Sequence, residues 1–167
     1  MVTPGIAGAE QRLSELGIVL PPPPTPLGAY VEAVRSGNLV FFSGMLPVVE
    51  NRPQFVGRVG GGLTPEDGRR AAVTATLNGL SAAKALLGSL DNVTAIAKLG
   101  VYIATEGVFR EHAKVADGAS KLLEAIFGTD KLSPRIRTGG GELAARRPYR
   151  SRARFRSRRR HASLAPS

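Results

Sequence analysis

Few side chains of this sequence could do chemistry on their own. The chain has two histidines, His112 and His161, and no cysteine. These residues do not assemble a Ser-His-Asp triad, a cysteine nucleophile or a histidine-based metal site, so we expect no metal. The remaining candidates are a phenol, a hydroxyl, a carboxylate and a guanidinium, at Tyr30, Ser43, Asp117 and Arg135. Each of these four also has an ordinary structural explanation.

The first third of the chain predicts a short helix, a connector and a hairpin. The helix covers 9–16 and ends before Gly17. The proline-rich run 21–26 predicts a stiff extended spacer. A proline-motif ligand is the alternative, but no basic flank orients it. Alternating apolar residues at 29–34 and an apolar run at 39–44 predict two paired strands.

Two longer helices and a long strand follow. Thr64 and Pro65 predict a helix start, because threonine caps and proline needs no hydrogen-bonded N–H there, and Gly88 predicts its end. The second helix is expected from about Val108 to Phe127. The strand between them, 92–104, should place alternate residues on one side: Val93, Ala95, Ala97, Leu99, Val101 and Ile103. With a further strand opening at SPRIRTG, the pattern predicts an α+β domain whose helices cover one sheet face.

The charge of the chain lies almost entirely in its C-terminal part. Residues 1–134 contain twelve basic and twelve acidic residues, whereas residues 135–167 contain eleven arginines and one acid, Glu142. The body is therefore neutral, and the net charge of +10 does not identify its partner. The arginines would bind nucleic acid non-specifically, because they would release counterions from it.

Targeting signals are not evident. No basic n-region precedes an apolar stretch at the N-terminus, and no apolar run approaches the ~20 residues that span a bilayer. The absence of cysteine suits a reducing compartment. These features predict a cytoplasmic protein that does not bind membranes.

Three segments of the chain carry a family resemblance: LGAYVEAVRSGNLVFFSGMLP, LNGLSAAKALLGSLDNVTAIAKLGVYIAT and SPRIRTG. Together they resemble the RidA/YjgF family of enamine/imine deaminases, which have also been described as endoribonucleases. The resemblance covers about residues 10–139. It implies a chorismate-mutase-like α+β sheet with two helices on one face. It also implies a homotrimer with clefts between subunits, a small imine or carboxylate ligand, and no cofactor.

The resemblance also implies which residues form the site. Arg135 occupies the place of the arginine that holds the carboxylate of 2-aminoacrylate, and a guanidinium suits this role because it grips a carboxylate through two hydrogen bonds. Arg137 is a weaker candidate on the same strand. The other substrate-binding positions implied by the family are Tyr30, Ser43, Gly44 and, with a weaker match, Asp117.

The resemblance stops at the triple glycine 139–141. Read one base out of phase, the codons from position 140 can encode V-A-S-L-P-L-G-A-P-I-E-V-E-L-V-F-E-V-A, which has the form of the family's last turn and strand. This reading has a glutamate at position 150, where the chain has Arg150; in the family a glutamate on this strand helps to position water. A frameshift is therefore our hypothesis for the tail, and an evolved nucleic-acid-binding arm is the alternative.

These observations divide the chain into three parts. We expect a helix and connector over 1–26, a RidA/YjgF-like domain over 27–139, and a disordered tail over 140–167 in which a last strand would bury unpartnered arginines. The leading function is hydrolysis of 2-aminoacrylate-type imines to keto acids and ammonia, impaired by loss of that strand. The alternatives are a non-catalytic metabolite-binding trimer and an RNA-binding or endoribonuclease protein.

Overall fold

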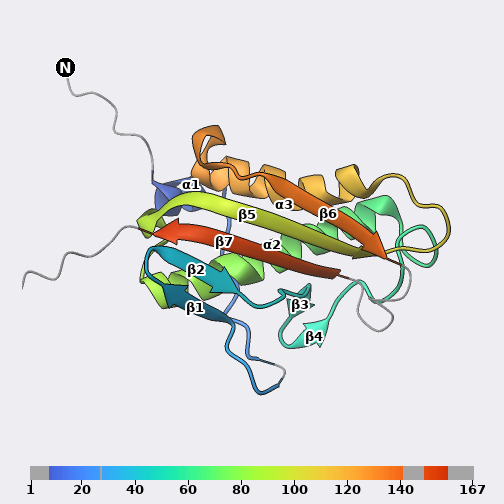
Figure 1. Ribbon diagram of the computed structural model, residues 1–167, viewed down its shortest axis with the longest axis horizontal. Helices are drawn as coiled ribbons and strands as arrows, with labels where there is room; N and C mark the ends of the chain where they lie inside the picture. The colour runs from blue at the N-terminus through green and yellow to red at the C-terminus, as the bar shows by residue number, and fades with distance from the viewer. Residues whose placement is uncertain (1–7, 27, 141–148, 158–167) are drawn as a thin grey trace, which may run out of the picture.

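A five-stranded sheet with two long helices on one of its faces forms the body of the structure (Figure 1). The structure is a computed structural model, and it describes residues 8–26, 28–140 and 149–157. Its elements are α1 (Ala9–Glu15), β1 (Ala33–Ser36), β2 (Leu39–Phe42), β3 (Val48–Val49), β4 (Arg52–Pro53), α2 (Pro65–Leu87), η1 (Leu90–Asn92), β5 (Val93–Ala104), α3 (His112–Phe127), η2 (Thr129–Lys131), β6 (Arg135–Gly140) and β7 (Tyr149–Ser157).

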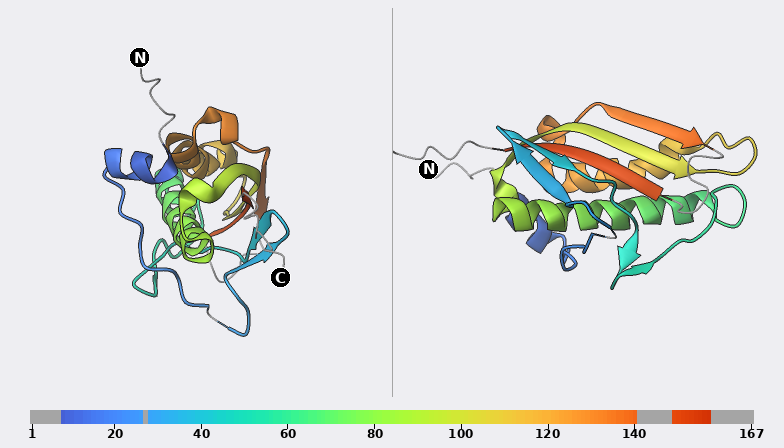
Figure 2. Two further views of the ribbon diagram at one scale, coloured as in Figure 1. Left: turned by 90° about the vertical axis from the view of Figure 1, so that its left-hand side faces the viewer. Right: turned by 60° about the horizontal axis from the view of Figure 1, so that its bottom comes forward.

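The strand order of the sheet is β1-β2-β7-β5-β6. The pairs β1–β2, β2–β7 and β7–β5 are antiparallel, and β5–β6 is parallel because α3 crosses over between them. Figure 2 shows α2 and α3 side by side beneath the sheet, with the opposite face open. The predicted α+β class with helices on one face is therefore confirmed.

Helix α2 begins and ends as its sequence predicts. Thr64 and Asp67 form a capping box, and Gly88 ends the helix in a left-handed conformation with φ of 79°. The buried hydrophobic face of α2 is rich in alanine: Ala71, Ala72, Ala75, Leu80, Ala82, Ala83 and Leu87. Small residues let α3 approach closely, and a side chain on Gly118 of α3 would lie 2.3 Å from the carbonyl oxygen of Arg69.

Three local predictions were wrong. The first strand, expected over 29–34, covers Ala33–Ser36 in the structure. The register between β5 and β7 shifts between Ile96 and Lys98, so Ile96 is buried and Ala97, expected to point inward, is exposed. Helix α3 begins at His112, and Val108, expected in its first turn, is 86% exposed in the preceding loop. Apolar spacing alone did not reveal either the bulge or the loop.

Strand β7 contradicts the expected disorder of the tail for residues 149–157. It lies in the middle of the sheet, between β2 and β5. Residues 141–148 and 158–167 of that tail are outside the described residues. The last strand of the sheet is therefore present in this chain, and β6 continues through Gly140.

The register of β7 shows which backbone positions of the strand its arginines occupy. Paired residues of neighbouring strands share a sheet face. Tyr102 and Lys98, both exposed, pair with Arg150 and Arg154. Conversely, the five buried hydrophobic residues of β5 in this register pair with uncharged residues of β7: Ile103 with Tyr149, Val101 with Ser151, Leu99 with Ala153, Ile96 with Phe155, and Val93 with Ser157. Gly100, which is buried but has no side chain, pairs with Arg152. The arginines of β7 thus occupy register positions of the open face.

Candidate functional site

Arg135 lies at the first position of β6, the edge strand of the sheet in the described part of the chain. Its Nη1 donates hydrogen bonds to Asp117 Oδ1 at 2.7 Å and to Ser120 Oγ at 2.9 Å. The Arg135 side chain is 21% exposed and that of Asp117 is 41% exposed. The structure therefore brings together two of the predicted site residues, as an ion pair at the edge of the molecule.

Helix α3 positions both acceptors. Asp117 and Ser120 are three residues apart on the helix, so their side chains lie on the same face and can contact one group. Sequence reasoning missed Ser120, although its spacing from Asp117 was a usable signal. No other hydrogen bond of the Arg135 guanidinium occurs within the described residues. Because a guanidinium has five N–H donors, its remaining edge can bind a carboxylate.

A second group of predicted residues lies near the opposite edge of the sheet. Tyr30 and Gly44 line a shallow open pocket, together with Glu32, Met45, Leu46 and Val48. Ser43, which precedes Gly44, donates a hydrogen bond from its hydroxyl to Glu32 Oε2 at 3.0 Å. Tyr30 itself is 45% exposed and precedes β1. This pocket combines a phenol, a carboxylate and backbone groups.

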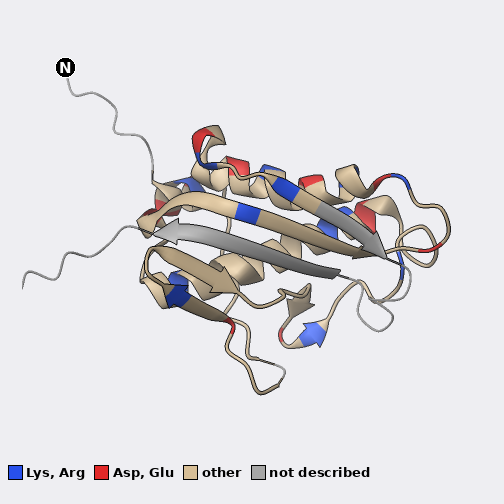
Figure 3. Cartoon of the chain, in the orientation of Figure 1, with Lys and Arg blue, Asp and Glu red and all other residues tan. Residues whose placement is uncertain are grey.

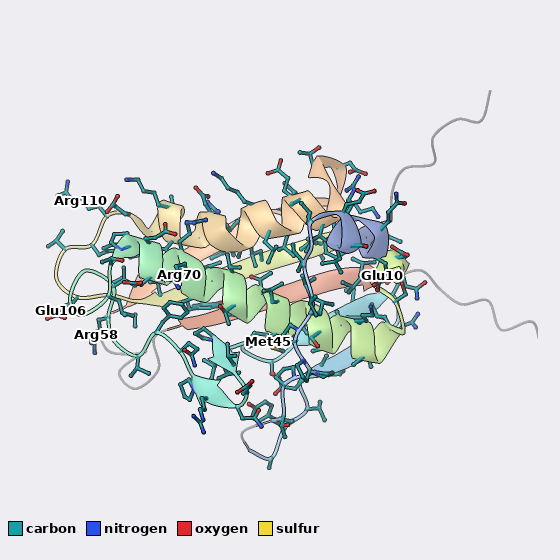
Figure 4. All side chains as sticks on the ribbon, turned by 180° about the vertical axis from the view of Figure 1, so that it is seen from behind. Glu10, Met45, Arg58, Arg70, Glu106 and Arg110 are labelled. Carbon is teal, nitrogen blue, oxygen red and sulfur yellow. The ribbon has the colours of Figure 1, made fainter. Side chains whose placement is uncertain are left out.

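Asn78 of α2 holds one wall of this pocket. Its Nδ2 donates hydrogen bonds to the carbonyl oxygens of Leu46 and Val48, both at 2.9 Å, and the residue is 3% exposed. Met45, labelled in Figure 4, is buried. A methyl side chain at Gly79 would lie 3.4 Å from Met45 Cγ, so α2 packs closely against this residue. Sequence reasoning missed Asn78, because a polar residue within a helix is typical of a solvated face.

The two groups are separate within one copy of the chain. Three strand spacings separate β2 from β6 in the strand order, which amounts to about 14 Å at about 4.8 Å per strand. Arg135 and Asp117 thus form one half of the predicted site, and Tyr30, Ser43 and Gly44 form the other. Arg137, also on β6, pairs in register with Val101 of β5 and belongs to the first edge.

The part of the chain that the structure describes gives little support for catalysis by histidine or by a bound metal. His112 makes an edge contact with the ring of Phe109, at 4.9 Å between centroids, and His161 lies outside the described residues. No group of three or more histidine, acidic or cysteine side chains gathers there to hold a metal. Figure 3 shows acidic and basic residues distributed along α2 and α3. Among the described helices, none is long and apolar enough to cross a membrane.

Comparison with known proteins gives consistent matches. The family described as YjgF/chorismate mutase-like, putative endoribonuclease, matches residues 10–139. Protein TCP17 of Trypanosoma cruzi is 37% identical over 119 residues, which cover 71% of this chain and 74% of that protein. The family match includes both halves of the predicted site.

Two solved structures share the fold over nearly their full length. A putative endoribonuclease from Shewanella oneidensis has a TM-score of 0.84 and 27% identity, covering 90% of this chain and 99% of the other. The protein Atu1372 of Agrobacterium tumefaciens, of unknown function, has a TM-score of 0.79 and 30% identity, covering 90% and 94%. From the extent of the sequence match and the shared sheet, the chain belongs to the RidA/YjgF family, with the YjgF/chorismate mutase-like fold.

Proposed function

We propose that this protein hydrolyses reactive enamine/imine intermediates of the 2-aminoacrylate type to keto acids and ammonia. The observation that carries the proposal is the Arg135 guanidinium, which two α3 side chains fix by one nitrogen while its other N–H groups make no hydrogen bond in the described chain. A planar, permanently charged group held in this way suits the carboxylate of a 2-imino acid.

The proposed reaction needs no redox partner. Water adds to the imine carbon, the carbon–nitrogen bond then breaks, and the products are ammonia and the 2-keto acid. Arg135 would bind and orient the carboxylate, so that the imine carbon is placed at a fixed distance from the attacking water. The family resemblance gives the water-positioning role to a glutamate at position 150. Because this chain has Arg150, which reverses the charge, we expect slow turnover.

We further propose that the complete site forms between copies of the chain in a homotrimer. A three-carbon imine cannot span the roughly 14 Å between the two halves of the site in one copy. The open sheet face also exposes apolar side chains on three strands, with Val34 47%, Tyr102 41% and Ile136 47% exposed. A neighbouring copy would cover part of this surface and supply the second half of the site. Sedimentation velocity tests the oligomeric state.

Imine hydrolysis can be tested with an imine generated in situ by an amino-acid oxidase, with ammonia or keto-acid release as the readout. We expect acceleration over the buffer rate, and a faster reaction for Arg150→Glu. Arg135→Ala should abolish the acceleration. If neither the parent nor Arg150→Glu accelerates hydrolysis but both bind the keto acid, the deaminase proposal fails and a metabolite-binding trimer takes its place.

The frameshift remains our proposal for the origin of the tail. Strand β7 covers 149–157, where the alternative reading frame can encode I-E-V-E-L-V-F-E-V. That reading would place apolar residues at the five β7 positions that pair with buried hydrophobic side chains of β5. Independent sequencing of codons 138–143, with mass spectrometry of the natural C-terminal peptides, tests it. Arginine-rich tail peptides from the natural source would overturn it.

The register of β7 favours non-specific nucleic-acid binding as a second candidate function of the chain as it stands. Arg150, Arg152 and Arg154 occupy register positions of the open sheet face, where Arg154 pairs with Lys98. Binding through these residues would fall steeply as salt rises. A salt titration with a single-stranded oligonucleotide tests this, and a shallow salt slope that survives deletion of 140–167 would contradict it.

A further inference from the structure

Asp117 is an unexpected neighbour for a group that is to bind carboxylates. It is itself a carboxylate, and its Oδ1 lies 2.7 Å from Arg135 Nη1. A ligand carboxylate on the free edge of the guanidinium would share the same cation with it. The negative charge of Asp117 therefore weakens the binding of an anionic ligand. Ser120, the second acceptor, is neutral and has no such effect.

Two other basic residues near this part of α3 have carboxylate partners, whereas Lys121, one turn after Asp117, is exposed and forms no ion pair within the described residues. Lys114, one turn before Asp117, pairs with Glu111. Arg69 of α2, whose backbone packs against Gly118, makes two hydrogen bonds to Glu66, at 2.8 and 2.6 Å. Within the described residues, Arg135 is the one cation that forms an ion pair with Asp117. Arg135, together with a ligand bound to it, is thus the charged group that lies in direct contact with the Asp117 carboxylate.

We infer that Asp117 determines the charge preference of the site: it favours zwitterionic ligands over plain anions. This inference rests on the proposed function. A protonated 2-imino acid carries a carboxylate and a positive nitrogen, so its net charge is zero, whereas the keto-acid product carries a net charge of −1. Asp117 repels the product more than the substrate, and this difference promotes release of the product after each turnover.

Asp117→Asn separates this effect from simple positioning. The amide retains an oxygen that can accept the hydrogen bond from Arg135 Nη1, while the negative charge is removed. Two unit charges about 6 Å apart at a protein surface interact enough to change affinity by roughly three- to tenfold. We therefore expect pyruvate to bind Asp117→Asn about three- to tenfold more tightly than it binds the parent.

The experiment measures the dissociation constants of L-alanine and pyruvate for the full chain by NMR titration. The two probes share a carbon skeleton and a carboxylate and differ at the second carbon, which carries an ammonium in one and a keto oxygen in the other. In Asp117→Asn, the ratio of the pyruvate to the alanine dissociation constant should fall about three- to tenfold. Glu124→Gln is the matched control: it makes the same charge change two turns further along α3, about 10 Å away, and should leave the ratio unchanged.

The outcomes separate this inference from the proposed function. A purely structural role for Asp117 would weaken both probes equally, and an unchanged ratio in Asp117→Asn would overturn the inference. Arg135→Ala should weaken both probes. If Arg135→Ala binds both probes as tightly as the parent does, the proposed carboxylate clamp fails as well. If Arg135→Ala loses both probes while the Asp117→Asn ratio is unchanged, the clamp stands and only the charge preference is wrong.

Discussion

At the β6 edge of the sheet, helix α3 holds the Arg135 guanidinium through two side-chain contacts, whereas at the β1–β2 edge a pocket is shaped largely by backbone. There, Asn78 fixes the carbonyls of Leu46 and Val48, and Tyr30 and Gly44 line the opening. The first edge supplies a fixed positive charge, and the second supplies space and polar acceptors. Neither edge alone contains what the proposed imine hydrolysis needs. This difference is the basis of our proposal that the site is divided between copies.

The largest loss of activity is expected from a substitution of Arg135 at the β6 edge. Arg135→Lys keeps the charge but loses the planar fork that binds a carboxylate by two hydrogen bonds, so kcat/KM should fall about 30- to 1000-fold, which corresponds to ~2–4 kcal/mol. Arg137→Lys is the control on the same strand and should change the rate little. Steady-state kinetics with the in situ imine measures both, and equal losses for the two variants would remove the special role of Arg135.

At the pocket edge, the largest effect should be on stability. Asn78→Ala leaves the Leu46 and Val48 carbonyls without their side-chain donor in a buried setting, which should lower the free energy of unfolding by about 1–3 kcal/mol. Asn92→Ala removes a single hydrogen bond, to Leu87 O, and should lower it less. Urea unfolding measures both variants. Equal stability of Asn78→Ala and the parent would show that this wall does not depend on Asn78.

Tyr30→Ala should affect activity more than stability. The side chain is 45% exposed, so its removal creates no buried cavity. Loss of one contact to the ligand should lower kcat/KM about three- to tenfold, the effect of about one hydrogen bond. The same kinetic assay, with a thermal melt as control, measures this. A rate equal to that of the parent would remove Tyr30 from the pocket's function.

The smallest expected effect lies away from both edges, where α1 attaches to the end of α2 (Figure 4). Burial tends to raise the pKa of Glu10, but hydrogen bonds from Lys84, Leu90 N–H and Ser89 outweigh it, and the net pKa is lowered from 4.5. A lowered pKa means that the carboxylate stabilises the fold above about pH 4.5 and that this stabilisation is lost as the pH falls through the folded-state pKa.

Glu10→Gln should therefore be less stable than the parent at pH 7, by under about 1 kcal/mol, and the difference should shrink below about pH 4.5. Urea unfolding at several pH values measures the difference. Activity at pH 7 should not change, because Glu10 touches neither half of the site. A stability difference that grows as the pH falls would contradict the assigned contacts.

Much of the fold could be predicted from local sequence signals. The capping pair Thr64 and Asp67, the stop at Gly88 and the apolar run that forms β2 act over a few residues, and the structure contains each of them. The first strand, expected over 29–34, instead covers Ala33–Ser36. The bulge at Ala97 and the late start of α3 depend on tertiary packing, so spacing alone missed them.

The tail shows why counting charges was not enough. The arginines of β7 fall at alternate positions, and in a strand alternate positions share one face. Their register with exposed Lys98 and Tyr102 is compatible with a strand in the middle of the sheet. For the site, the resemblance identified Arg135 and Asp117 separately, but their ion pair and the role of Ser120 required the three-dimensional arrangement.

The division of the site between copies is the central claim, and mixing two defective variants tests it most directly. Arg135→Ala removes the clamp, and Gly44→Glu introduces a negative charge into the pocket; both are built on the Arg150→Glu background. If each site combines Arg135 of one copy with Gly44 of another, refolding an equal mixture should restore activity to about a quarter of the background, since one site in four then has both native halves. Activity no higher than the average of the two variants measured separately would contradict the account.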